Sequence, residues 1–106
     1  MDFSNEIFEV EFTDECIEEM TAIYEYISNN LKEDSSAKKL MTEVLDKVLN
    51  LAKLPEIYVK IGKVDNLKLE YRRMVVKNYI VLYTVDNKKK KVYIMHMIYG
   101  KRDYLK

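Results

Sequence analysis

The chain has 106 residues, 48% of them hydrophobic and 34% charged, which is typical of one globular domain and unlike a disordered chain. No apolar run approaches the roughly 20 residues that span a bilayer, and the N-terminus lacks the basic and then apolar pattern of a secretion signal. The single cysteine, Cys16, excludes an internal disulfide and a cysteine-built metal site. We therefore predict one domain over residues 1–106, cytoplasmic, with no membrane partner, no cofactor and no metal.

Charge is divided unequally along the chain although the net charge is zero. Residues 1–57 carry 14 acidic and 5 basic side chains, whereas residues 58–106 carry 4 acidic and 13 basic ones. This division predicts an electrostatic partner for the basic half, such as nucleic acid, a nucleoprotein machine or an acidic peptide. The alternative is that the two halves attract each other within the fold.

The first half is expected to form a strand and two helices. Residues 6–12 alternate apolar and acidic side chains, which predicts a half-buried strand. Thr13 offers an N-cap for a first amphipathic helix, and residues 34–36 offer one for a second, which must end before Pro55. The first apolar stripe consists of Ile17, Met20, Tyr24, Ile27 and Leu31. The second consists of Ala37, Met41, Val44, Val48 and Leu51.

The second half is expected to form a sheet. Strands are predicted at residues 58–61, 67–76, 79–85 and 92–99. Lys77 and Asn78 form a tight turn in this prediction, because Asn tolerates a positive φ. The uninterrupted apolar run 79–85 indicates a central strand that is buried on both faces. The order β-α-α-β-β-β predicts an α+β fold, with a two-helix hairpin packed on one face of a small, mostly antiparallel sheet.

Four segments in this order resemble the RelE/ParE toxin superfamily of type II toxin–antitoxin systems, and together they cover nearly the whole chain. They are FEVEFTDECIEEMTAIYEYI, LAKLP, EYRRMVVKNYIVLYTV and VYIMHMIYGKRDYL. The central hairpin and the basic tail are closer to the ParE-like branch, which is associated with inhibition of DNA gyrase. The RelE-like branch is associated with cleavage of messenger RNA on the ribosome. The resemblance implies a growth-inhibiting toxin that a cognate antitoxin neutralises in a hetero-oligomeric complex.

Basic and aromatic side chains of the hairpin and the tail are the candidate contacts with the target or the antitoxin. They are Arg72, Arg73, Lys77, Tyr99, Lys101, Arg102 and Tyr104. The alternatives are that the two arginines make ordinary ion pairs with Glu70 or the acidic helices, and that Tyr99 closes the core.

Metal-independent RNA cleavage would need a base, an acid and cations at the phosphate. The resemblance makes Arg73 and Arg102 the catalytic candidates for this chemistry. Arg102 matches a basic position of the family tail, and Arg73 matches one on the hairpin strand. RelE-type nucleases, however, carry an Arg after the central-strand Tyr, where this chain has Ile80, and their tail aromatic lies further along than Tyr104.

His96, the only histidine, is expected to be a hydrogen-bonded core residue on the strand face of Val92, Ile94 and Ile98, rather than an acid–base group. Three functions remain open. The chain could be a ParE-like gyrase inhibitor, a ribosome-dependent endoribonuclease, or a non-toxic adaptor that still binds an antitoxin. In each case we expect an acidic antitoxin segment to cover the basic face.

Overall fold

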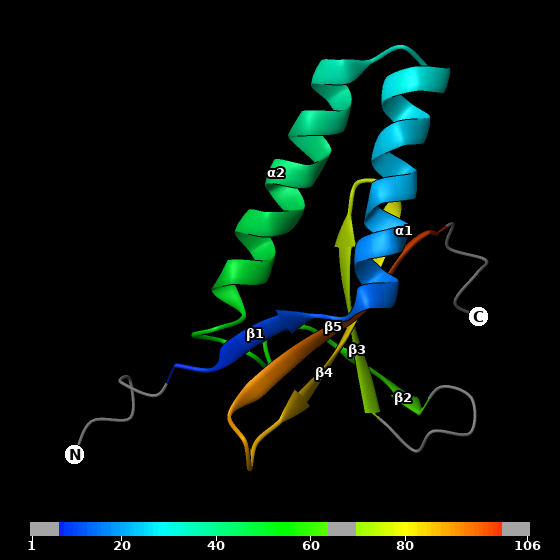
Figure 1. Cartoon of the computed structure of the whole chain (residues 1–106). Helices are drawn as coiled ribbons and strands as arrows, with labels where there is room; N and C mark the ends of the chain where they lie inside the picture. Colours follow the sequence, from blue (N-terminus) through cyan, green and yellow to red (C-terminus); the bar gives the residue numbers. More distant parts are fainter. Residues whose placement is uncertain (1–6, 64–69, 101–106) are drawn as a thin grey trace.

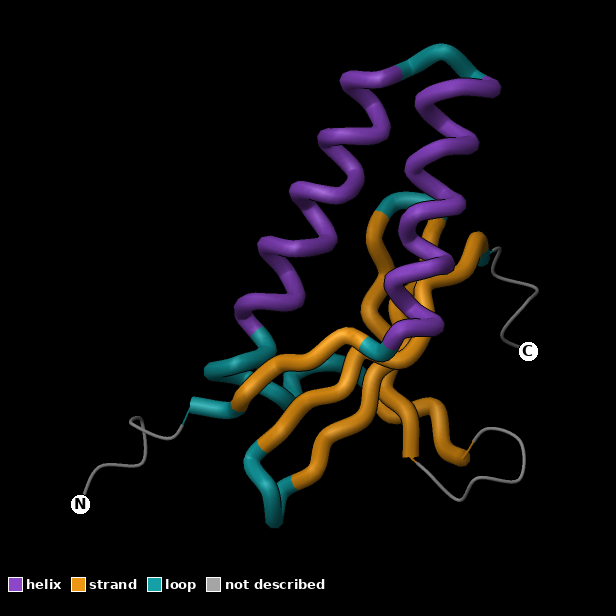
Figure 2. Tube along the Cα trace, in the orientation of Figure 1, coloured by secondary structure: helices purple, strands orange, loops and turns teal. Residues whose placement is uncertain are grey.

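The computed structural model describes residues 7–63 and 70–100. In this part of the chain, two helices lie on one face of a five-stranded sheet, as predicted (Figures 1 and 2). The helical layer comprises α1 (Asp14–Glu25), a π-helical turn η2 (Tyr26–Asn30) and α2 (Asp34–Asn50). The strands are β1 (Glu9–Phe12), β2 (Lys60–Lys63), β3 (Glu70–Val76), β4 (Tyr79–Asp86) and β5 (Lys91–Tyr99).

The sheet has the strand order β1-β5-β4-β3-β2. Only the β1–β5 pair is parallel, and the other three pairs are antiparallel. The parallel pair arises because the chain passes through the whole helical hairpin and three strands before β5 returns beside β1. The apolar strand β4 lies at the centre, and Ile80, Val81, Leu82 and Tyr83 on it are all buried, as the sequence predicted.

The main core lies between the helices and the sheet. Ala37, Leu40, Val44 and Val48 of α2 are buried there, so the predicted stripe of the second helix is confirmed, with Met41 half-buried. On the first helix Ile27 is buried, but Ile17 and Leu31 are about half exposed. Cys16 is fully buried in place of Ile17, which rotates the core-facing side of α1 relative to the prediction.

Thr13 caps α1 as predicted, because its Oγ1 accepts the backbone N–H of Cys16 at 3.1 Å. The helical segment continues beyond Glu25 in an irregular form. The backbone there widens into η2, where the N–H of Leu31 donates to the carbonyl of Tyr26. Asp34 is the first residue of α2 rather than its cap, so the helix begins one residue earlier than a cap at Asp34 would place it. The Ser28 hydroxyl donates a hydrogen bond to the Asp34 carboxylate.

Two local irregularities explain further differences in the sheet. In the predicted tight turn, the positive φ of 54° belongs to Lys77 rather than to Asn78. In β5, Leu82 pairs with His96 and Tyr83 with Ile94, so Met95 is the extra residue of a β-bulge. The bulge reverses which residues face the helices. Consequently Val92, Ile94 and Met97 lie in the main core, whereas Ile98 packs on the opposite face with Tyr71, Ile80 and Leu82.

Candidate functional site

A cavity of about 670 Å³ brings together two of the predicted contact residues, Lys77 and Tyr99, at the end of the sheet nearest the π-turn. Its walls come from α1, η2, the start of α2, the β3–β4 turn, β4 and β5. Three tyrosines dominate the lining, and we call this site the tyrosine pocket: Tyr26 from η2, Tyr79 from β4 and Tyr99 from β5. The π-turn matters here because it places Tyr26 in the pocket while Ile27 enters the core.

The tyrosines form a compact aromatic cluster. The rings of Tyr79 and Tyr99 meet edge to face, with 5.5 Å between their centroids. Burial raises the pKa of Tyr79, and the neighbouring Tyr99 and Tyr26 add to this rise. Tyr26 and Tyr99 are each 54% exposed, so both offer aromatic surface to a binding partner. The alternative in which Tyr99 closes the core is therefore not what the structure has.

Lys77 stands at the mouth of this pocket and joins two layers of the fold. Its Nζ lies 3.6 Å from a carboxylate oxygen of Glu43 on α2, and the Lys77 side chain is 56% exposed. The ion pair leaves much of the lysine accessible and is worth only about 0–1 kcal/mol at this exposure. Lys77 can therefore contact a partner while it keeps its place in the fold.

The side chain of Arg72, in contrast, is held within the fold by hydrogen bonds to the backbone. Its Nη1 donates to the backbone carbonyls of Tyr58 at 2.7 Å and Glu56 at 3.3 Å, and its Nη2 lies 3.9 Å from the Glu56 carboxylate. Only 13% of the side chain is exposed. The guanidinium fastens the segment between α2 and β2 to the sheet, and the Tyr83 hydroxyl helps by donating to the Pro55 carbonyl. The alternative reading, in which this arginine makes an ordinary ion pair, is right in kind, but the partner is Glu56 of the loop after α2 rather than Glu70 or an acidic helix.

Arg73 lies on the opposite face of β3, because successive side chains of a strand alternate. It pairs in register with Leu82, which belongs to the apolar cluster away from the helices, and its backbone N–H donates to the Val59 carbonyl. Its side chain is half-buried, and within residues 7–63 and 70–100 we find no ion pair for its guanidinium. The remaining predicted site residues, Lys101, Arg102 and Tyr104, lie outside the described residues.

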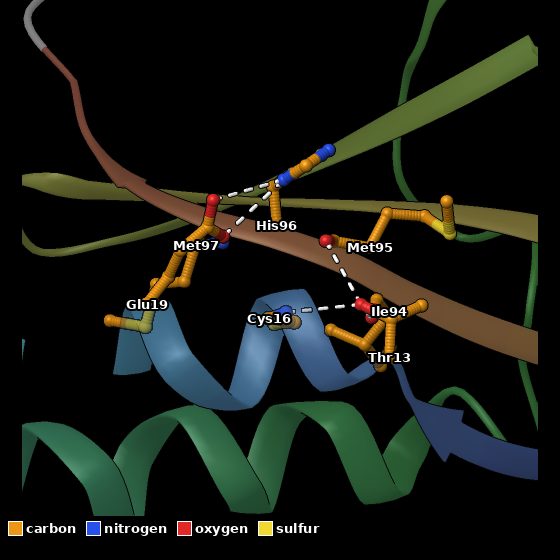
Figure 3. Close-up of polar contacts among 7 residues, drawn as sticks. All are labelled: Thr13, Cys16, Glu19, Ile94, Met95, His96 and Met97. Carbon is orange, nitrogen blue, oxygen red and sulfur yellow. Dashed lines mark hydrogen bonds and ion pairs between the residues drawn. The ribbon is translucent and has the colours of Figure 1, made fainter. Parts of the chain in front are cut away.

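A polar cluster that the sequence did not predict lies where α1 meets the β5 bulge (Figure 3). The carboxylate of Glu19 contacts His96 Nδ1 at 3.1 Å and accepts the backbone N–H of Met97 at 3.0 Å. Beside it, Thr13 Oγ1 donates to the Met95 carbonyl at 3.2 Å. The Glu19 carboxylate thus accepts a hydrogen bond from the Met97 N–H, which lies next to the bulge and faces α1.

His96 is therefore hydrogen-bonded, as expected, but 27% of its side chain is exposed. Its ring stacks on Tyr71, with 6.5 Å between the centroids, on the side of the sheet away from the helices. The prediction that it shares a face with Val92 and Ile94 is wrong, because the bulge at Met95 lies between them. No sequence signal could have paired Glu19 with a residue 77 positions away.

The three predicted cations that the structure describes do not converge on one point. Arg72 is fixed to a loop, Arg73 lies on the other face, and Lys77 is at the tyrosine pocket. In the described part of the chain, no group of three or more His, Cys, Asp or Glu side chains is arranged to hold a metal ion. What the arrangement offers best is an accessible aromatic surface with a lysine at its edge, which suits binding to a protein.

Solved structures with the same fold are toxin–antitoxin proteins. A chain of the chromosomal ParDE system from P. aeruginosa is 14% identical, with a TM-score of 0.72 over 92% of this chain and 100% of that one. A chain of the toxin–antitoxin complex RelBE2 from Mycobacterium tuberculosis is 16% identical, with a TM-score of 0.63 over 93% and 98%. A chain of the archaeal RelE–RelB complex from Pyrococcus horikoshii OT3 is 17% identical, with a TM-score of 0.58 over 91% and 98%. The protein is thus a small α+β protein with the RelE/ParE toxin fold.

The family follows from the sequence itself. The family model for the ParE toxin of the type II toxin–antitoxin system parDE matches residues 10–104. The chain therefore belongs to the ParE toxin family. Comparison with curated proteins gives no significant match.

Proposed function

We propose that this toxin arrests growth by binding DNA gyrase, and that a cognate antitoxin neutralises it in a hetero-oligomeric complex. The observation that carries the proposal is the match of the ParE family model over residues 10–104. Ile80 supports it as well, because the resemblance implies an arginine in RelE-type nucleases directly after the central-strand tyrosine, where this chain has Ile80.

The tyrosine pocket is the contact surface that we propose for the target. Tyrosine combines a large apolar ring with a polar hydroxyl, and residues of this type contribute much of the free energy of binding at protein interfaces. Tyr26, Tyr99 and Lys77 are accessible there. The separation of Arg72 from Arg73 also favours binding over catalysis, because RNA cleavage needs several groups around one phosphate.

The test is induction of the chain in a bacterial host. Shortly afterwards, the topology of a reporter plasmid and the 5′ ends of cellular RNA are measured together. We expect growth arrest with relaxed plasmid and intact messages. In the Tyr26→Ala/Tyr99→Ala double variant the arrest should be lost. Tyr93→Ala on β5 is the matched control, because Tyr93 is a partly exposed tyrosine that does not line the pocket.

One observation favours ribosome-dependent RNA cleavage as the second candidate. Arg73 and His96 both pair in register with Leu82, so they flank the same residue on the face away from the helices. A half-buried arginine and a histidine oriented by Glu19 would suit phosphate binding and proton transfer. New RNA 5′ ends at fixed codon positions, abolished by Arg73→Ala or Arg102→Ala, would establish this function instead.

The antitoxin partner is supported by the neighbours of the fold, which include chains of RelBE2 and RelE–RelB complexes. We expect the free chain to arrest growth and the complex to be inert. A chain that binds its antitoxin but never arrests growth would be the third alternative, a non-toxic adaptor. Co-expression with the product of the adjacent open reading frame separates these outcomes.

A further inference from the structure

The tyrosine pocket carries a negative charge in addition to its aromatic rings. Glu33, which precedes α2, is part of its lining, and the Glu33 side chain is exposed. Among residues 7–63 and 70–100, the Glu33 carboxylate has no ion-pair or hydrogen-bond partner. The other charged residue of the lining, Lys77, lies 3.6 Å from Glu43, so its charge is balanced. The lining described here is therefore anionic.

The backbone fixes the place of Glu33 at this pocket. Its N–H donates to the carbonyl of Ile27 at 3.1 Å, and its own carbonyl accepts the N–H of Ala37 at 3.0 Å. Ile27 and Ala37 are both buried in the main core, so the packing of η2 and α2 determines where Glu33 lies. Glu33 is also the N-cap residue of α2, yet its side chain makes no capping hydrogen bond. Its carboxylate is thus available to a ligand.

The aromatic rings attract the same kind of ligand as the carboxylate does. The face of a tyrosine ring is electronegative, so a cation within about 6 Å of the ring centre is attracted to it. Tyr26 and Tyr99 are half exposed, so their rings can be reached from solvent. Tyr79 lies against Tyr99 and supports its ring edge to face. Several aromatic rings around one space are the arrangement in which proteins bind organic cations.

The guanidinium group of arginine matches this pocket better than other charged groups do. It is planar and weakly hydrated, so it stacks flat on an aromatic ring while its N–H groups donate to a carboxylate. The ammonium group of lysine is compact and strongly hydrated, and it does not stack in this way. Nucleic-acid bases also stack on tyrosine, but their phosphates would meet the like charge of Glu33.

We propose that the tyrosine pocket is a guanidinium site, which holds an arginine side chain of the protein target against Tyr26 and Tyr99 and pairs it with Glu33. This inference rests on the proposed target contact and names the residue type that the target contributes. An apolar side chain of the target would not use Glu33. The basic tail of the chain itself, whose Lys101 and Arg102 lie outside the described residues, is an occupant that the test separates.

The experiment titrates the purified full-length chain with two short peptides, which differ only in a central arginine or citrulline. Citrulline has the shape of arginine but no charge. NMR resonances of the tyrosine rings report binding in the pocket. We expect the arginine peptide to bind about threefold to tenfold more tightly at low salt, because both the aromatic rings and the carboxylate favour its charge. The difference should shrink as salt screens the ion pair.

Variants identify the groups that produce this preference. Glu33→Gln should remove most of the difference between the two peptides, and Tyr26→Ala/Tyr99→Ala should weaken the binding of both. Glu18→Gln is the matched control, because Glu18 is an exposed acidic residue of α1 that does not line the pocket. This control variant should keep the full preference for arginine.

Equal affinity for the two peptides, or a preference that survives Glu33→Gln, would overturn the proposal. Tighter binding of a short RNA oligonucleotide than of the arginine peptide would also overturn it. So would tighter peptide binding by the Lys101→Ala/Arg102→Ala variant, which would mean that the tail of the chain occupies the pocket. The peptides do not report on gyrase, so their failure to bind leaves the gyrase proposal standing. Arginine binding without inhibition of supercoiling would refute the gyrase proposal alone.

Discussion

Neighbouring residues of one strand have different environments in this protein, and Arg72 and Arg73 are the clearest example. The two are equivalent in composition and charge, yet Arg72 donates to two loop carbonyls on one face while Arg73 lies on the other. The sequence made both of them candidate contacts with the target or the antitoxin. It could not assign them to separate roles, because the partners of Arg72 are 14 and 16 residues away.

The two arginines therefore form a matched pair for a stability measurement. Arg72→Ala should lower the free energy of unfolding by about 1.5–3 kcal/mol, since hydrogen bonds from a charged donor are lost and the carbonyls of Glu56 and Tyr58 lose their partner. Arg73→Ala should change it by about 0.5 kcal/mol or less. Urea unfolding of the two variants checks this. Equal losses would mean that the loop does not depend on Arg72.

The burial of Cys16 leads to a second prediction for a single residue, which concerns the pH dependence of stability. Burial raises the pKa of its thiol from 9.0 to about 12, and the charge of Glu19 adds to the rise. The unfolded thiol ionises first as the pH increases. The stabilising contribution of the neutral thiol is therefore complete below pH 9 and is lost progressively toward pH 12.

As the pH rises from 9 to 12, the free energy of unfolding should therefore fall less in the Cys16→Ala variant than in the parent chain. Tyr83, whose pKa is also raised to about 12 by burial, is common to both proteins and does not affect the comparison. Unfolding free energies measured across this pH range provide the test. Parallel curves for the two proteins would show that the thiol does not titrate as its burial implies.

At the scale of the elements, the order and type of the helices and strands followed from the sequence, because the apolar periods of 2 and 3.6 residues differ clearly along this chain. The local irregularities of these helices and strands could not be predicted from the sequence. The π-turn at 26–30, the bulge at Met95 and the positive φ of Lys77 all depend on how elements meet in space. These exceptions shape the candidate sites, since the π-turn positions Tyr26 and the bulge turns His96 toward Glu19.

The contact between α1 and β5 can be tested through Glu19. Glu19→Ala removes the acceptor of the Met97 N–H and the partner of His96, so it should lower the free energy of unfolding by about 1–3 kcal/mol. Glu15→Ala is the control, because Glu15 is exposed on the same helix. Equal stability of both variants in chemical denaturation would mean that the carboxylate contributes nothing to the docking of α1 on the sheet.

In the molecule as a whole, the unequal charge along the sequence becomes a difference between layers. The acidic first half forms β1 and the helices, and the basic second half forms the rest of the sheet. The two halves also attract each other, since Lys77 pairs with Glu43 and Lys91 with Glu9 and Glu11. The alternative reading, in which the two halves attract each other, is thus confirmed in part, whereas an electrostatic partner for the basic half stays a prediction.

No helix in the described ranges is long and apolar enough to cross a membrane. Two apolar hollows are separate in the described part of the chain: the tyrosine pocket, and a groove between α1 and α2 that is lined by Ile17, Tyr24 and Leu45 among others.

We propose that this ParE family toxin acts on DNA gyrase by binding. Its most direct test is a supercoiling reaction with purified gyrase and relaxed plasmid, to which the purified full-length chain is added. We predict that supercoiling is inhibited in proportion to the amount of chain added, and that the Tyr26→Ala/Tyr99→Ala variant no longer inhibits it. Undiminished supercoiling at a large excess of folded chain would contradict the proposal that the chain inhibits gyrase.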